Sequence, residues 1–148
     1  MNRRSLVSAL SLLASATSWA AEPIVTDAAT YFPLDGAVYS AAVKVKTEAA
    51  LIFVSGGDAI DAPAAFAGLS ERLSLTGATP ADLVNVRGSL LTAPGEPVLM
   101  EPWNGGWGNL LNHLAYRPTR TTLGTVALAT PSARLNAEGV AARVLRPD

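Results

Sequence analysis

The sequence predicts an α+β domain in which two helices cover one face of a mixed sheet. Three observations lead to this prediction. Runs with the two-residue alternation of strands surround two segments with helical spacing, in the order β-β-α-β-α-β-β. Gly and Pro residues separate these runs and mark the turns between them. The chain of 148 residues is 49% hydrophobic and 16% charged, a composition typical of one globular domain.

The first twenty residues are predicted to be an export signal. Arg3 and Arg4 form a positively charged start, and residues 6–16 form a short apolar run. Small residues then suit cleavage before Ala21, and the run is too short to span a bilayer. We therefore expect an exported, periplasmic protein without membrane contact after cleavage. The paired arginines are compatible with both the general secretion route and the twin-arginine route.

The domain is expected to begin near residue 36. Residues 21–35 lack periodicity and contain Pro23 and Pro33, which indicates an N-terminal tail or a lead-in strand. Residues 36–148 contain all the other predicted elements and form the single domain.

The first two strands of this domain are predicted to form a hairpin. Residues 41–46 alternate valine with lysine, and residues 51–54 form a continuous apolar run that suits a buried strand. Residues 47–50 connect the two, without the Asn-Gly signal that would fix the register.

The first helix is predicted between residues 61 and 75. Asp61 is a suitable N-cap, and Pro63 fits the first turn. Gly77 ends the helix, and Pro80 prevents it from resuming. The apolar stripe that would lie on the sheet consists of Phe66, Leu69 and Leu73.

The remaining elements are one helix and three strands. Residues 83–91 alternate apolar with polar side chains, as a strand with one buried face does. Residues 103–114 have apolar side chains at helical spacing, although three glycines weaken this helix by roughly 1 kcal/mol each. Residues 121–128 and 134–144 are predicted strands. Because both helices cover the same face of the sheet, we expect another subunit to cover the other face.

The composition excludes several function classes. The chain has no Cys and one His, which excludes disulfides, thiol nucleophiles and zinc or haem sites built from several such ligands. The single His113 is expected to be a surface or packing residue. Removal of the signal lowers the number of basic residues from 11 to 9 against 12 acidic ones, a net charge of −3. This charge gives no support for nucleic-acid binding.

Several segments, in order along the chain, resemble the RidA/YjgF family. They are residues 39–45 (YSAAVKV), 51–56 (LIFVSG), 77–84 (GATPADLV), 117–124 (RPTRTTLG) and 135–142 (LNAEGVAA). The resemblance implies the chorismate-mutase-like α+β fold and a homotrimer with clefts between neighbouring subunits. It also implies that these clefts hydrolyse reactive 2-imino acids to 2-oxo acids and ammonia, without a cofactor.

The resemblance implies roles for particular side chains. Arg120 matches the arginine that holds the substrate carboxylate, and a guanidinium does this through two parallel hydrogen bonds while staying charged. Tyr39 matches an aromatic residue that lines the cleft. Asn104 and Trp107 match the Asn-x-x-Tyr of the family, with an indole N–H in place of the hydroxyl. The residues that fall where the family hydrogen-bonds its ligand are Thr122, Ser55 and Gly56.

The last predicted strand departs from the family. The family has Val-Glu-Ile-Glu there, and its first Glu orders the water that attacks the imine. The alignment puts Asn136 at that place, and an amide cannot take a proton from water at neutral pH. Glu138 lies on the same face of the strand, about 6.6 Å away, and a two-residue shift would bring it into position. Asn136 and Glu138 are therefore alternative candidates for the catalytic position.

Two functions follow from this resemblance. One is an exported imine deaminase whose substrate carboxylate is held by Arg120. The other is a non-catalytic trimer that binds small carboxylate metabolites in the same clefts, because Asn136 replaces the catalytic Glu. Export favours the second function, since the source of toxic imines is cytoplasmic. The ribonuclease activity also ascribed to the family is disfavoured by the acidic balance and the single His.

Overall fold

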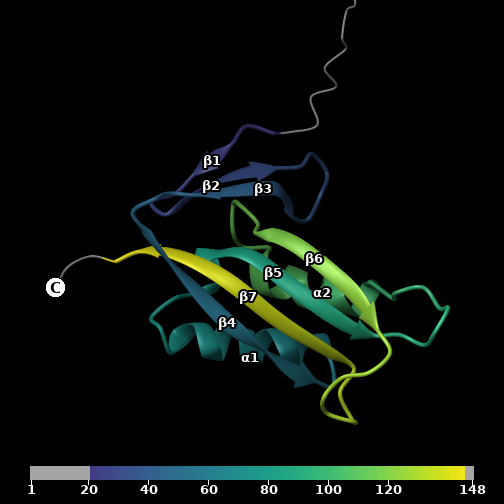
Figure 1. Ribbon diagram of the computed structural model, residues 1–148. Coiled ribbons are helices and arrows are strands. Elements are labelled where there is room, and N and C mark those ends of the chain that lie inside the picture. Colours follow the sequence, from purple (N-terminus) through teal and green to yellow (C-terminus); the bar gives the residue numbers. More distant parts are fainter. Residues whose placement is uncertain (1–20, 146–148) are drawn as a thin grey trace, which may run out of the picture.

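The computed structural model describes residues 21–145 (Figure 1). Its elements, in chain order, are β1 (Ile24–Val25), β2 (Ala29–Pro33), β3 (Ser40–Val45), β4 (Ala49–Ala59), α1 (Ala62–Ser74), the 3-10 turn η1 (Pro80–Asp82), β5 (Leu83–Leu91), α2 (Glu101–Leu111), β6 (Thr119–Thr125) and β7 (Leu135–Val144). Two helices and a mixed sheet make this an α+β fold, as the sequence predicts. The expected export signal lies outside the described residues.

The strands form two sheets rather than the single sheet that the sequence predicts. β4, β7, β5 and β6 lie in that order in a mixed sheet, in which β5 and β6 are parallel and the other pairs antiparallel. β1, β2 and β3 form a separate antiparallel sheet, which lies at one end of the molecule, away from α1 (Figure 1). From β3 onward the elements follow the predicted order β-β-α-β-α-β-β.

The hairpin predicted for residues 41–46 and 51–54 is wrong. β3 pairs with β2, and β4 pairs with β7. Residues 21–35, predicted to be a tail or a lead-in strand, contain the two strands β1 and β2. β2 is the backbone partner of β3, a place that the predicted hairpin assigns to β4. A turn at Lys46 then leads the chain from one sheet into the other.

Tyr31 shows why this N-terminal segment belongs to the fold. Its side chain is buried, and its hydroxyl donates a hydrogen bond of 3.0 Å to the carbonyl of Leu83. Its ring lies 4.4 Å from the ring of Tyr116, measured between centroids. Burial of an aromatic ring with a satisfied hydroxyl fixes the small sheet against the start of β5.

Both helices cover the same face of the four-stranded sheet. Alternate side chains of β5 and β7, such as Val86 and Ala137, point toward the helices and are buried. Gly88 lies under the indole of Trp103, where an added Cβ would come within 2.5 Å of the ring, so α2 packs close to β5. The helices contribute to this core the side chains of Phe66, Leu69, Leu73, Trp103, Trp107 and Leu111.

The predicted ends of the first helix are confirmed. A side-chain oxygen of Asp61 accepts a hydrogen bond of 2.8 Å from the backbone N–H of Ala64, as an N-cap does. The helix ends at Ser74, and Gly77 follows with a φ of 71°, a conformation that favours glycine. These ends hold α1 across β4 and β7 (Figure 1).

On the opposite face of the four-stranded sheet, β2 and β3 pack against the end of β7 around Ala142. No described element covers the rest of this face, which we term the open face. Three large apolar side chains are exposed on it, namely Phe53 (77%), Leu51 (50%) and Leu123 (49%). Between them lie the polar side chains of Asn85, Arg87, Asn136 and Glu138. A mixed patch of this kind is typical of an interaction surface. Within residues 21–145, no helix is long and apolar enough to cross a bilayer.

Candidate functional site

Arg120 on β6 is surrounded by three side chains from two other parts of the chain, the residue before β3 and α2. Its Nη1 donates a hydrogen bond of 2.7 Å to the side-chain oxygen of Asn104 on α2. Its guanidinium carbon lies 4.9 Å from the ring centre of Tyr39 and 5.4 Å from that of Trp107. Both distances are within the range of cation–π attraction. The structure therefore brings together four of the residues that the sequence selects.

The fold explains this grouping. Asn104 and Trp107 are three residues apart on α2 and so lie on the same side of the helix. The indole N–H of Trp107 donates a hydrogen bond of 2.7 Å to the carbonyl of Val38, which fixes the ring and the chain just before Tyr39. Arg120 is paired with the buried Val86 in the register of β5 and β6, which directs it toward α2.

The environment of Arg120 suits the binding of an anion. The side chain is half-buried, and this burial lowers the pKa of Arg120 from its ordinary value, while Tyr39 acts in the opposite direction. An arginine stays protonated in proteins, so the group remains a cation. Its planar fork has five N–H donors, and partial desolvation strengthens a bidentate bond to a carboxylate.

Thr122 lies on the same face of β6 as Arg120, two residues further along. It is paired with Gly88 in the register of β5 and β6. Its hydroxyl is buried and has no hydrogen-bond partner within residues 21–145. The hydrogen-bonding capacity of this side chain is thus unused at the edge of the Arg120 group.

Asn136 and Glu138, the two candidates for the catalytic position, lie on the other side of the sheet. Both side chains project from β7 onto the open face, while Arg120 faces the helices. Glu138 is opposite Arg87 on β5, and its Oε1 lies 2.5 Å from the Nε of Arg87. Within one chain, neither candidate faces Arg120.

Asn136 is held by an acidic residue on the neighbouring strand. Its Nδ2 donates a hydrogen bond of 3.0 Å to Oδ1 of Asp58, and Oδ2 of Asp58 accepts one of 2.7 Å from the backbone N–H of Thr130. The hydrogen bond from Asn136, followed by that from Thr130, lowers the pKa of Asp58. Gly56 lies against Asn136, since an added Cβ would come within 2.1 Å of the amide oxygen. Sequence reasoning selected Gly56 and Asn136 but missed Asp58.

Ser55 is exposed next to Gly56, at the bulge of β4. It lines a shallow cavity of about 420 Å³ on the open face. The cavity is also lined by Phe53, Val54, Asn85, Arg87, Glu138, Gly139 and Val140. The predicted residues thus form two groups on opposite faces of one sheet, one around Arg120 and one around Asn136 and Glu138.

Comparison with known proteins identifies the fold. No family model matches the chain, and no curated protein matches it. Among solved structures, the Rid family protein YyfB from Yersinia pestis is 23% identical, with a TM-score of 0.60 over 70% of this chain and 86% of YyfB. The chain has the Rid fold. This confirms the predicted YjgF-type, chorismate-mutase-like architecture.

Two further solved structures share the Rid fold with this chain. A Thermotoga maritima protein, provisionally named an endoribonuclease, is 21% identical, with a TM-score of 0.51 over 83% of this chain and 98% of its own. TdcF from E. coli, solved with bound serine, is 14% identical, with a TM-score of 0.51 over 63% of this chain and 80% of TdcF.

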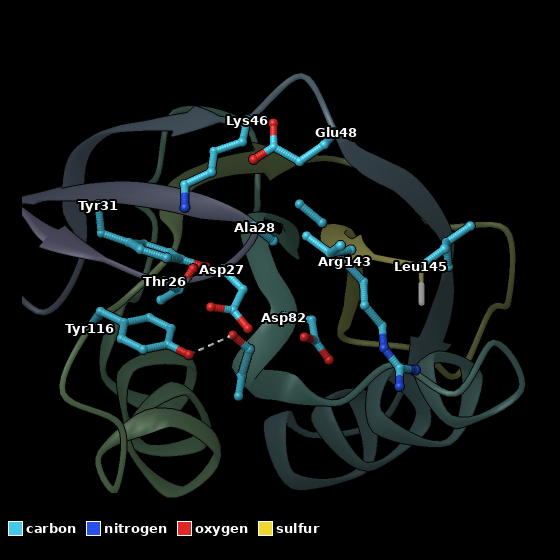
Figure 2. A pocket seen from close by; sticks show the side chains of 13 residues that line it. Thr26, Asp27, Ala28, Tyr31, Lys46, Glu48, Asp82, Tyr116, Arg143 and Leu145 are labelled. Carbon is cyan, nitrogen blue, oxygen red and sulfur yellow. Dashed lines mark hydrogen bonds between the residues drawn. The ribbon is translucent and has the colours of Figure 1, made fainter. Parts of the chain in front are cut away.

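A further cavity of this Rid-fold chain lies between the small N-terminal sheet and the end of β7 (Figure 2). It measures about 1000 Å³, and Asp27, Asp82, Lys46 and Arg143 are among its lining residues. Several of its polar groups already have partners in the fold. Asp82 accepts hydrogen bonds from Thr79, and Arg143 donates to the carbonyl of Gly77. The hydroxyls of Tyr31 and Tyr116 donate to the carbonyls of Leu83 and Ala81. These contacts assign the cavity walls a structural role.

The described part of the Rid-fold chain contains no group of three or more His, Cys, Asp or Glu residues that could hold a metal ion. His113 is exposed just beyond the end of α2, in agreement with a surface role.

Proposed function

We propose that this chain is a divergent member of the Rid/YjgF family that binds a small 2-oxo or 2-imino acid by its carboxylate. The observation that carries the proposal is the position of Arg120 between the rings of Tyr39 and Trp107, with Asn104 as hydrogen-bond partner. Side chains from two separate segments converge on one guanidinium, which indicates a site built for an anion rather than a surface arginine. The serine bound to E. coli TdcF, a small molecule with a carboxylate, supports this ligand class.

The binding sites are proposed to lie between the subunits of a homotrimer. The apolar side chains of the open face need a cover, and a chain without Cys gains no stability from disulfides. Arg120 and the polar residues of the open face lie on opposite sides of the sheet. A second chain, placed against the open face, could bring its own Arg120 to Asn136 and Glu138 of the first.

The proposed reaction in these clefts is the hydrolysis of 2-imino acids to 2-oxo acids and ammonia. Arg120 would hold the carboxylate and so fix the imine carbon for attack by a water molecule on the facing chain. The alternative is a trimer that binds small carboxylates without catalysis, and the amide of Asn136 at the catalytic place favours it. The endoribonuclease name of the T. maritima neighbour does not suit this chain, which has an acidic excess and one His.

The test of binding is calorimetric titration with pyruvate, a stable analogue of a 2-imino acid. We expect Arg120→Ala to lower the affinity by at least about 100-fold, because it removes a charge-assisted bidentate contact. Arg134→Ala, which removes an exposed arginine outside the Arg120 group, is the matched control and should bind as the wild type does. Unchanged binding by the Arg120 variant would exclude this residue from the site. Ammonia release from an imine generated in situ separates the enzyme from the non-catalytic binder.

We also propose that the protein acts after export, in the periplasm. Sequencing of the N-terminus of the protein recovered from a periplasmic fraction should then start at Ala21.

A further inference from the structure

The open face carries a carboxylate whose two oxygens are both oriented by hydrogen bonds. Asp58 on β4 lies directly across from Asn136 on β7. Its Oδ1 accepts from the side-chain amide of Asn136 at 3.0 Å, and its Oδ2 accepts from the backbone N–H of Thr130 at 2.7 Å. The side chain of Thr130 and the backbone N–H of Ala129 also bond to this carboxylate. The carboxylate is nevertheless reached by solvent, so a water molecule can approach it.

A bulge in β4 is what places Asp58 on this face. Val54 is buried and faces the helices, and in a regular strand Asp58, four residues further along, would face them too. Between Val54 and Gly57 the strand advances three residues while β7 advances two. The extra residue reverses the alternation and turns Asp58 toward Asn136 on the open face. Bulges that re-aim a side chain in this way are common next to active sites.

We propose that Asp58 is the general base of the cleft, taking a proton from the water that attacks the imine, and that Asn136 positions its carboxylate. The proposal rests on the proposed function, because it assigns a role within the same clefts. The proposal also explains the amide of Asn136, because this amide orients a carboxylate that the neighbouring strand supplies.

The alternative carboxylate, Glu138, is less suited to this role. Its Oε1 is 2.5 Å from the Nε of Arg87, so this carboxylate is already engaged by a charged side chain of the same face. The partners of Asp58 are neutral N–H and O–H groups, which orient the carboxylate without a charged partner. These hydrogen bonds lower the pKa of Asp58, so the group is ionised at neutral pH, which is the form in which a carboxylate can act as a base.

The proposed hydrolysis has two steps, addition of water and loss of ammonia. The oxygen of water forms a bond to C2 of the protonated imine, a proton of that water passes to Asp58, and the π electrons of the C=N bond move to nitrogen. The product is a neutral carbinolamine. Asp58 then returns the proton to the amine, the C–N bond breaks, and ammonia leaves as the hydroxyl oxygen forms the C=O bond and its proton passes to solvent. The net reaction converts an iminium acid and water to a 2-oxo acid and ammonium.

The first experiment compares Asp58→Asn with wild type. Ammonia release is measured from 2-iminopropanoate, generated in situ by oxidation of alanine, and pyruvate binding is measured by calorimetry on the same samples. We expect kcat to fall by at least about 100-fold, the usual contribution of a general base, with pyruvate affinity within about twofold of wild type. Glu71→Gln, a carboxylate-to-amide change on the exposed side of α1, is the matched control and should retain full activity.

Other outcomes overturn the proposal. Full hydrolysis by Asp58→Asn removes Asp58 from the reaction, and loss of hydrolysis in Glu138→Gln with an active Asp58→Asn assigns the base to Glu138. A wild-type protein that binds pyruvate through Arg120 but releases no ammonia overturns the role of Asp58 and leaves carboxylate binding intact. A wild-type protein that does not bind pyruvate overturns the proposed function itself.

A second experiment separates a base from a structural residue. Asn136→Ala keeps the carboxylate but removes the hydrogen bond that most lowers the pKa of Asp58. We expect the acidic limb of the pH–rate profile to move to higher pH in this variant, and Asp58→Glu to recover part of the rate lost in Asp58→Asn. An acidic limb that stays in place would overturn the assignment, even if Asp58→Asn failed to fold.

Discussion

Arg120 has aromatic rings on two sides, and this arrangement suits an arginine better than a lysine. The flat guanidinium lies near the rings of Tyr39 and Trp107 while one edge donates to Asn104. A lysine ammonium would keep the charge but could neither stack nor present two parallel donors. The aromatic residues therefore fix the orientation of the fork and leave its outer edge for a carboxylate.

A second residue-scale prediction concerns Tyr31. Burial, followed by the nearby Tyr116 and Asp82, raises the pKa of Tyr31 far above its ordinary value of 10.0. The folded state thus resists ionisation of this phenol, so its contribution to stability is complete below pH 10 and is lost as the pH rises beyond that value. We expect the free energy of unfolding of wild type to fall progressively as the pH rises above 10.

The variant Tyr31→Phe tests whether ionisation of Tyr31 causes this loss of stability at high pH. At pH 8 it should be less stable by about 1 kcal/mol, because the carbonyl of Leu83 loses its hydrogen bond from Tyr31. Its stability should fall less steeply than that of wild type above pH 10, and urea unfolding at each pH measures the difference. Parallel pH curves for the two proteins would contradict the prediction.

At the scale of the elements, replacing each of two adjacent glycines in α2 by alanine should change the stability of the protein in opposite directions. A Cβ at Gly105 would meet nothing within 4 Å, so Gly105→Ala should stabilise the helix by about 0.5–1 kcal/mol. A Cβ at Gly106 would come within 2.7 Å of the side chains of Ala62 and Phe66 on the neighbouring helix. Gly106→Ala should therefore destabilise the protein by about 1–3 kcal/mol through overpacking. Thermal unfolding of the two variants measures these changes in stability. Equal shifts of the melting temperature in the two variants would show that the helices can separate at no cost.

The elements that could be predicted from sequence are those defined by local signals. The cap at Asp61, the stop at Gly77 and the alternation along residues 83–91 each act within a few residues. Strand partners are set by contacts between distant segments, so the local pattern predicted β4 as the partner of β3, whereas β3 pairs with β2. The Arg120 group was predicted from a family motif, whereas Asp58 depends on a bulge that has no sequence signal of its own.

At the scale of the whole molecule, the open face predicts assembly. Phe53 is 77% exposed in the single chain, so Phe53→Glu should hardly change the stability of the subunit fold. In a trimer that covers this face, the same change would bury an unpaired charge and should yield monomers. Light scattering at micromolar concentration measures the mass. Leu75→Glu, at an equally exposed position beyond the end of α1, is the control and should remain trimeric. A monomeric wild type, or a trimeric Phe53→Glu, would contradict the assembly.

The two groups of site residues face opposite sides of the sheet, and this predicts complementation between subunits. If each cleft takes Arg120 from one chain and Asp58 from the next, then Arg120→Ala and Asp58→Asn each inactivate every cleft of their own trimers. In mixed trimers made by co-expression, a cleft between an intact Arg120 and an intact Asp58 forms in about one quarter of the positions, because each neighbour is drawn independently. Ammonia release should therefore recover to about a quarter of the wild-type rate in the mixture. Mixing the purified trimers without exchange of subunits is the control and should give no recovery. A mixture no more active than its parents would contradict the sharing of clefts between subunits. Because the sheet separates Arg120 from Asp58 within one chain, such a result would exclude one of the two residues from the reaction.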